Sequence, residues 1–209
     1  MAAIRFVRVV LLVNFIALAI GGCEATKRSQ PLPPDWGEPQ TSISNVIDNF
    51  KRALIETKAD RYAAQLADSF TFAFAQQDIG GSHNNPATWN RVADVLSMTH
   101  MCGKQVANTE GYVCDTIAFS FDRGTPVTDP DHPNWTKLVL SNIYLTVVSH
   151  KQDTLDPLNY EVSGDQAYLY FAQSGSTWKL IRWEDHPIQH KGATSVNSTT
   201  IGKIKSSWH

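Results

Sequence analysis

The sequence predicts an α+β domain in which helices pack on one face of a strongly bent antiparallel sheet. Apolar residues recur at helical spacing in the segments 42–56, 60–66 and 86–102. Alternating apolar and polar residues dominate from residue 117 onward. The strand-like run 135–150 would span roughly 50 Å if it were straight, at about 3.3 Å per residue. We therefore expect this run to bend or bulge, which would curve the whole sheet.

Each helix is predicted from a capping residue followed by apolar residues on one face. Ser42 or Ser44 suits the N-cap of the first helix, and Asp60 suits that of a second, short one. Asn85 and Pro86 offer an N-cap and a first-turn proline for the third. The predicted inward faces of the three helices contain Val46, Ile47, Phe50, Leu54, Tyr62, Ala63, Leu66, Trp89, Val92, Ala93 and Leu96.

The strands are predicted from alternation and from the turn residues between them. Ser141 and Asn142 lie near the middle of the longest run, where we expect its bend. Ser174, Gly175 and Ser176 form the predicted turn between the last two strands. The expected strands cover residues 70–74, 117–121, 135–150, 160–171 and 178–185.

The first 22 residues have the order of an export signal. Arg5 and Arg8 precede an apolar stretch from Val9 to Ile20, which is shorter than the roughly 20 residues that a helix needs to cross a bilayer core. Two glycines then precede Cys23. This pattern resembles a bacterial lipoprotein signal, and the resemblance implies cleavage before Cys23 and attachment of fatty acyl chains such as palmitate to that cysteine. The mature protein would then be anchored to a membrane of the bacterial cell envelope, facing the periplasm or the exterior.

The sequence divides into four parts on this interpretation. Residues 1–22 are the signal peptide, and the proline-rich segment 23–40 is a tether because it cannot bury enough apolar surface to order itself. Residues 41–188 form the α+β domain, and 189–209 form a C-terminal extension.

The charge balance excludes one class of partner. The chain has 18 basic and 20 acidic side chains, and two of the basic ones, Arg5 and Arg8, belong to the signal. The mature chain therefore has 16 basic and 20 acidic side chains, a formal charge of −4. Nucleic acids recruit basic surfaces, so we expect no nucleic-acid partner. There is no polybasic cluster either, so the lipid alone would hold the protein on the membrane.

Cysteine usage agrees with export. With Cys23 committed to lipid, Cys102 and Cys114 remain, one on each side of a short connection. Two thiols in an oxidising compartment can pair, and we expect a disulfide between them. The alternative is two separate buried thiols. Neither these cysteines nor the acidic turn 129–132 has the ligand pattern of a metal site, so no metal is expected.

Three local patterns suggest a family. They are the segment Tyr62–Phe74, the segment Val162–Ala167, and the final strand pattern Trp178–Asp185. Together with the order of the elements, they resemble the nuclear-transport-factor-2-like (NTF2-like), or SnoaL-like, cone-shaped fold. The resemblance implies a pocket inside the cone and, in many members, a dimer formed through the exposed face of the sheet. Members include isomerases, dehydratases and cyclases as well as modules without catalysis.

A candidate pocket follows from the late strands. Tyr168, Tyr170, Trp183 and Asp185 could line a site for a small apolar ligand, although aromatic residues at such spacing also suit a plain core. Adjacent strand residues face opposite sides, so either Trp183 and Asp185 or Glu184 and its alternate neighbours point inward. The sequence leaves this choice open.

The function predicted from the sequence is a membrane-anchored, non-catalytic module for ligand binding or assembly, with no cofactor. A homodimer is the further partner that the resemblance implies. No set of residues matches one enzyme's catalytic motif position by position, so no catalytic residue is assigned. The alternative is an envelope enzyme that transfers protons on a small apolar substrate, as isomerases or dehydratases do. A buried acid with a raised pKa beside a tyrosine would favour the alternative.

Overall fold

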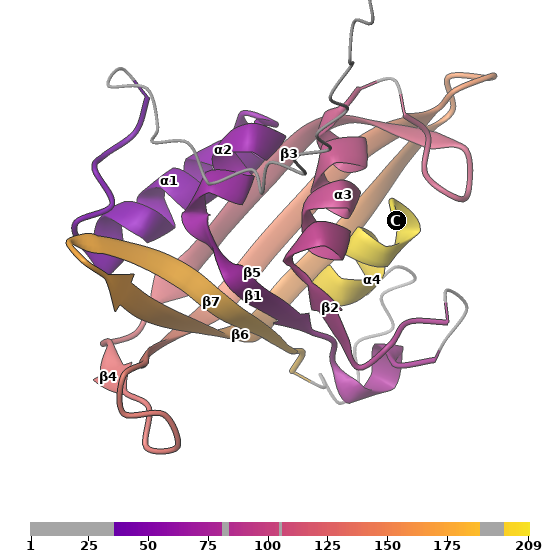
Figure 1. Cartoon of the computed structure of the whole chain (residues 1–209). Coiled ribbons are helices and arrows are strands. Elements are labelled where there is room, and N and C mark those ends of the chain that lie inside the picture. Colours follow the sequence, from indigo (N-terminus) through magenta and orange to yellow (C-terminus); the bar gives the residue numbers. More distant parts are fainter. Residues whose placement is uncertain (1–35, 81–83, 105, 189–198) are drawn as a thin grey trace, which may run out of the picture.

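A computed structural model describes residues 36–80, 84–104, 106–188 and 199–209. Figure 1 shows helices gathered on one face of a bent sheet. The elements in chain order are α1 (Ile43–Ile55), α2 (Ala59–Gln65), β1 (Leu66–Ala73), a short 3-10 turn (Gln76–Asp78), β2 (Thr88–Asn90), α3 (Arg91–Cys102), β3 (Tyr112–Arg123), β4 (Val127–Thr128), β5 (Thr136–Lys151), β6 (Pro157–Ser174), β7 (Thr177–His186) and α4 (Ile201–Ser207).

The seven described strands form one sheet. The sequence predicted an antiparallel sheet, but the observed sheet is mixed. Its order is β2-β1-β7-β6-β5-β3, with β4 added beside β5. The strands β3, β5, β6 and β7 form an antiparallel meander, whereas β1 runs parallel to β7. The α+β class is therefore confirmed. The parallel pair arises because β1 and β7, the first and last strands of the chain, lie side by side. A sequence reveals the pairing of neighbouring strands through the turn between them, and these two strands are not joined by a turn.

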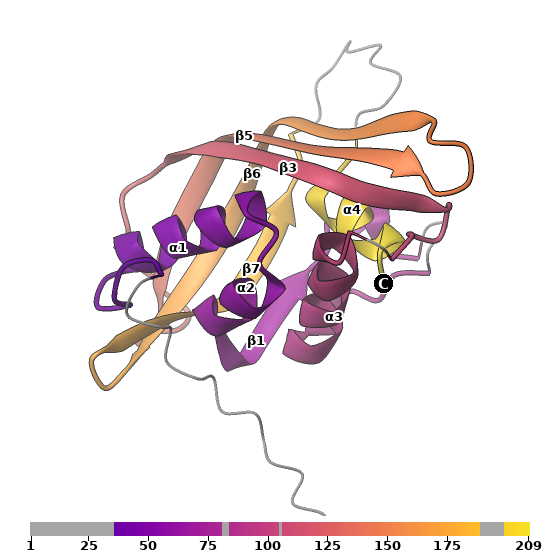
Figure 2. The same cartoon turned by 90° about the horizontal axis from the view of Figure 1, so that it is seen from above.

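The bend predicted for the run 135–150 is present in strand β5. Pairing between β5 and β6 shifts in register between Leu140 and Tyr144. Within this stretch Asn142 has a φ of 48° and its side-chain amide donates to Asp122 Oδ2 at 2.7 Å. Such a bulge increases the local twist of a sheet. It lets the long β5–β6 hairpin curve around the helices, as Figure 2 shows from above.

Two predicted boundaries differ from the structure. The third helix begins at Arg91 with Asn90 as its N-cap, and not at Asn85, because β1 captures the preceding segment as the short strand β2. The predicted tether ends earlier than residue 40: the backbone of Glu38 exchanges hydrogen bonds of 2.8 and 2.6 Å with the side chain of Asn49 on α1. Ser42 caps α1, as predicted.

The C-terminal segment is part of the core, although the sequence analysis ended the domain at residue 188. Ile201, Ile204 and Trp208 are buried with the sheet and the other helices. On the side toward α3, Ser97 Oγ donates to the carbonyl of Lys205 at 2.6 Å, and His100 Nδ1 donates to the carbonyl of Trp208 at 3.0 Å. Figure 2 shows α4 between α3 and the curving strands. It thus closes the interior, by which we mean the space between the helices and the concave face of the sheet.

Among the described residues, none of the helices is both long and apolar enough to span a membrane.

The close approach of α4 gives a test of its place in the core. A Cβ added at Gly202 would lie 2.8 Å from Phe74 Cδ1 and 3.4 Å from Asp185 Oδ2. Gly202→Val should therefore lower the free energy of unfolding by about 2 kcal/mol, a typical cost of overpacking. Urea denaturation followed by tryptophan fluorescence would measure it.

Lys203→Val is the matched control because Lys203 is the exposed neighbour on the same helix. It introduces the same β-branched side chain without the clash. Equal losses in the two variants would show that α4 does not pack as described.

Candidate functional site

Strand β7 positions the residues of the predicted pocket, and the structure settles which of its faces points inward. Trp183 is 2% exposed and Asp185 is 4% exposed. Arg182, Glu184 and His186 point to the outer face, the side of the sheet turned away from the helices. Ile181 has no partner on β6, so a bulge at this residue lets both Leu180 and Trp183 reach the core.

The four predicted pocket residues do not meet in one site. Trp183 pairs with Leu169 and Asp185 with Ala167, whereas Tyr168 pairs with Glu184. Residues paired across antiparallel strands share a face of the sheet. Tyr168 and Tyr170 therefore lie on the outer face, whereas Trp183 and Asp185 lie on the inner face. The prediction that all four residues line one pocket is therefore wrong.

Tyr168 and Tyr170 belong instead to a polar and aromatic surface. The Lys137 ammonium lies 3.6 Å from the ring centre of Tyr168, and the His186 ring lies 4.0 Å from it on centroids. Tyr170 donates to Glu184 Oε2 at 3.1 Å. Burial raises the pKa of Tyr170, and the neighbouring Glu184 carboxylate raises it further. Tyr170 therefore serves as a neutral donor, and both tyrosine rings face the Lys137 ammonium.

A polar cluster lies in the middle of the interior, where three helices meet. Tyr62 comes from α2, Asp94 from α3 and Lys205 from α4. Tyr62 donates to Asp94 Oδ2 at 2.6 Å, and the Lys205 ammonium pairs with Asp94 Oδ1 and donates to the Tyr62 hydroxyl at 3.1 Å. All three side chains are almost completely buried.

Aromatic rings enclose the ammonium of this cluster. Lys205 Nζ lies 4.2 Å from the ring centre of Phe72, 4.6 Å from that of Trp183 and 5.5 Å from that of Tyr62. Burial lowers the pKa of Lys205, while Asp94 acts in the opposite direction. Burial and the Asp94 carboxylate raise the pKa of Tyr62 well above its ordinary value. The cluster has groups that could transfer protons, but α4 separates them from solvent.

Asp185 anchors the start of α4. Its Oδ2 accepts a hydrogen bond of 2.8 Å from the backbone N–H of Gly202. Nearby, the hydroxyl of Thr200 donates to Asp78 Oδ2. Burial raises the pKa of Asp185 to about 7, opposed by the Gly202 bond and assisted by the charges of Asp165 and Asp78. The other oxygen, Asp185 Oδ1, is buried and has no hydrogen-bond partner within the part of the chain that the structure describes.

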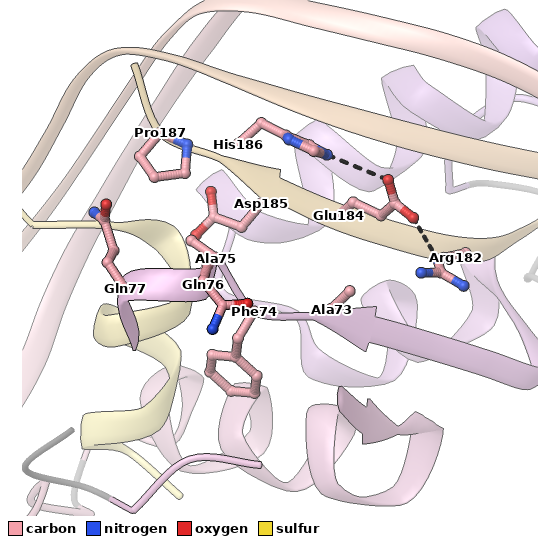
Figure 3. Close-up of a pocket in the computed structure, with 10 residues that line it drawn as sticks. All are labelled: Ala73, Phe74, Ala75, Gln76, Gln77, Arg182, Glu184, Asp185, His186 and Pro187. Carbon is pink, nitrogen blue, oxygen red and sulfur yellow. Dashed lines mark hydrogen bonds and ion pairs between the residues drawn. The ribbon is translucent and has the colours of Figure 1, made fainter. Parts of the chain in front are cut away.

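A hollow of about 440 Å³ lies beside Asp185. It forms where β1 ends at Ala73 and the chain turns away from β7, which leaves space beside the last residues of β7 (Figure 3). On its outer side, Glu184 links Arg182, at 2.7 Å, with His186, at 3.2 Å. The hollow is lined by Ala73, Phe74, Ala75, Gln76, Gln77, Arg182, Glu184, Asp185, His186 and Pro187.

Of the predicted site residues, only Asp185 lines this hollow. Gln76 and Gln77 were missed because they follow a strand in an irregular turn, which gives no periodic signal. Lys205 was missed although α4 has a readable pattern: Thr200 as N-cap, then Ile201, Ile204 and Trp208 on one face. A lysine on the apolar face of a helix is ordinarily read as solvent-exposed, because lysine is rarely buried without a partner.

The other predicted sites have different outcomes. Cys23 lies outside the described residues. Cys102 and Cys114 are both free thiols in this structure, whereas the sequence predicted a disulfide. Burial raises the pKa of each thiol to about 12, and for Cys102 the nearby Cys114 contributes. The disulfide stays a prediction. In the described segments, no group of three or more His, Cys, Asp or Glu side chains is placed to hold a metal ion.

Comparisons with known proteins give similarities in structure but not in sequence. No protein-family model matches the chain, and no curated protein matches it. A provisionally assigned aromatic ring hydroxylase from Novosphingobium aromaticivorans is similar at a TM-score of 0.49 and 7% identity, covering 79% of this chain and 95% of that one.

Two further solved structures have the NTF2-like description. A superfamily protein from Salmonella enterica has a TM-score of 0.46 at 10% identity, covering 73% of this chain and 94% of its own. A protein of unknown function from Pseudomonas putida has a TM-score of 0.45 at 10% identity, covering 77% and 94%. At such scores the likeness supports no conclusion about function, so the site must be judged on its own geometry.

The raised pKa of Asp185 predicts how stability depends on pH. A carboxyl group with an unfolded pKa near 3.8 and a folded pKa of about 7 ionises first in the unfolded chain as the pH rises. Its contribution to stability is therefore complete below about pH 4 and is lost as the pH rises to about 7. Between pH 5 and pH 8 the loss should be roughly 3 kcal/mol, at about 1.4 kcal/mol per pH step.

Asp185→Asn keeps the shape and the acceptor for Gly202 but cannot ionise. Urea denaturation of both proteins from pH 5 to pH 8 measures the effect, because contributions from other groups, including Asp78, are present in both. The wild type should lose stability relative to the variant across this range. Parallel pH profiles would contradict the assignment.

Proposed function

We propose that the chain is a lipid-anchored binding module of the bacterial cell envelope that holds a small ligand in the hollow beside Asp185, without catalysis. The observation that carries this proposal is a hollow of about 440 Å³ lined in part by Asp185, whose buried Oδ1 lacks a hydrogen-bond partner among the described residues. Ligand pockets ordinarily measure about 300–1,000 Å³ and have a few well-placed polar groups.

The lining residues indicate the chemistry of the ligand. Asp185 Oδ1 can accept a hydrogen bond, so the ligand needs a hydroxyl, amide or amine donor. Phe74 and Pro187 offer apolar contacts, while Gln76 and Gln77 offer amides. We therefore infer a small molecule with an apolar body and at least one hydrogen-bond donor. This refines the purely apolar ligand expected from the sequence.

The position of the hollow suits a protein tethered through its N-terminus. The chain enters the domain near the start of β7, where Trp178 N–H donates to the carbonyl of Gln40 at 2.8 Å. The hollow lies at the other end of the same strand, at Asp185. Seven residues of strand separate these positions by roughly 23 Å. The described chain therefore enters the domain at the end of β7 opposite the hollow.

The raised pKa of Asp185 supports one alternative, an enzyme that transfers protons. A general base works best with a pKa near the operating pH, and Asp185 has a pKa of about 7. The lining of the hollow contains no tyrosine to act as a partner, and the Tyr62–Asp94 pair is enclosed by α4. We favour binding because Arg182 and His186, the basic side chains of the lining, are both paired with Glu184 on the outer side of the hollow and not with Asp185.

A homodimer remains a further proposal. On the outer face of the sheet, aromatic rings and charge occur together, as in many protein interfaces. The residues concerned are Trp135, Lys137, Tyr168 and Tyr170. This face adjoins the hollow, because His186 and Glu184 line the hollow and contact Tyr168 and Tyr170 respectively.

Ligand binding should raise thermal stability progressively as the ligand concentration rises, because only the folded state binds. A thermal-shift screen of small amphipathic compounds with hydroxyl, amide or amine groups is the test. A ligand of the hollow should lose at least about tenfold in affinity in Asp185→Asn, since the amide presents a donor where an acceptor is needed.

Asp68→Asn is the matched control because it makes the same change at an exposed position on β1. Equal affinity in both variants would place binding elsewhere. Turnover of a bound compound that disappears in Asp185→Asn would establish the enzyme alternative instead.

The anchor has its own test. Cys23→Ala should abolish metabolic labelling with radioactive palmitate and move the protein from the membrane fraction to the soluble envelope fraction, because one residue supplies the acylated thiol. Cys102→Ala is the control, since Cys102 is a partly buried residue packed against the core and should not affect labelling. Persistent labelling in Cys23→Ala would overturn the lipoprotein assignment.

A further inference from the structure

The surroundings of Lys205 have the composition of a ligand site. One carboxylate (Asp94), one hydroxyl (Tyr62) and the ring faces of Phe72, Trp183 and Tyr62 meet at a single ammonium group. Carboxylates and aromatic faces are the groups with which proteins recognise alkylammonium ligands. We call this arrangement the ammonium cage.

The cage and its occupant come from separate parts of the fold. Tyr62 and Asp94 lie on α2 and α3, while Phe72 and Trp183 lie on the parallel strands β1 and β7. These elements pack together through contacts that do not involve α4: Phe72 and Trp183 meet edge to face with centroids 5.5 Å apart, and Tyr62 contacts Phe50 at 5.2 Å. Lys205 enters from α4, which forms no strand pairing and lies at the end of the chain.

Stability alone does not explain a lysine here. Burying an ion pair removes two charges from water, and replacing such a pair by well-packed apolar residues is often neutral or stabilising. Ile201, Ile204 and Trp208 already supply the apolar contacts that hold α4. Apolar residues at both 205 and 94 would fill the same space without the charges, so packing alone does not require an ammonium group here.

We propose that the interior of this protein is a binding site for a primary alkylammonium group, occupied here by Lys205 of α4 as a tethered ligand. An external alkylammonium compound would compete with Lys205 for the same carboxylate and aromatic faces. This site is distinct from the hollow beside Asp185, and the proposal does not depend on a ligand there.

Chemical rescue tests the proposal. Lys205→Ala removes three methylene groups and the ammonium, which are the non-hydrogen atoms that n-propylammonium restores. Addition of n-propylammonium chloride should raise the midpoint of thermal unfolding of Lys205→Ala in a saturable way. The neutral n-propanol, and sodium chloride at the same ionic strength, should have at most a small effect, because neither supplies an organic cation to Asp94.

Three comparison proteins make the test specific. The double variant Lys205→Ala/Asp94→Asn should bind n-propylammonium at least about tenfold more weakly, since it lacks the carboxylate. Lys205→Met should not respond, because its side chain fills the cage. The wild type should respond only at concentrations at least about tenfold higher, because Lys205 competes from within the same molecule at a high effective concentration.

Three results would overturn the proposal. Stabilisation of Lys205→Ala by n-propanol as large as that by n-propylammonium would show that the space is merely apolar. Equal responses of the wild type and Lys205→Ala would place amine binding elsewhere. If Lys205→Ala does not fold alone, it should refold in n-propylammonium but not in n-propanol. Failure to refold, with Lys205→Met folded, would contradict an ammonium-selective cage.

Discussion

The ion pair between Lys205 and Asp94, buried among aromatic rings, determines what the rest of this structure can do. It ties the last helix to α3 and fills the centre of the space that the bent sheet and the helices enclose. Tyr62 completes the pair by donating to the same carboxylate. A charge that is removed from water requires such partners, because an unpaired buried ion is strongly destabilising. When α4 closes the interior, it therefore also brings Lys205 to Asp94, so the two charges pair in the same step.

Because α4 fills the interior, the proposed ligand site lies at the edge of the fold, in the hollow beside Asp185. Asp185 belongs to both parts of this region: its Oδ2 holds the first turn of α4 through Gly202, and the residue also lines the hollow beside β7. A ligand bound there would contact the residue that anchors α4. Asp185 is therefore the residue through which the two proposed sites are in contact.

Periodicity predicted the α+β class, the bulge near Asn142 and the cap at Ser42, because each depends on local spacing or on a single residue type. It did not predict that β1 lies parallel to β7, nor which face of β7 points inward. The second question depends on the bulge at Ile181, since one extra residue exchanges the two faces of a strand. Gln76 and Gln77 follow no periodic pattern, and Lys205 is buried only because Asp94, 111 residues away in the chain, compensates its charge.

A double-mutant cycle between Lys205 and Asp94 tests most directly the claim that their ion pair closes the interior. The free energies of unfolding of the wild type, Lys205→Met, Asp94→Asn and the double variant would be measured by urea denaturation at neutral pH. Each single change should be strongly destabilising, because it leaves one buried group without its partner, and the double variant should recover much of the loss. The account predicts a coupling energy of about 2–3 kcal/mol, at the upper end for residues in contact. A coupling below about 0.5 kcal/mol, as independent sites give, would contradict it.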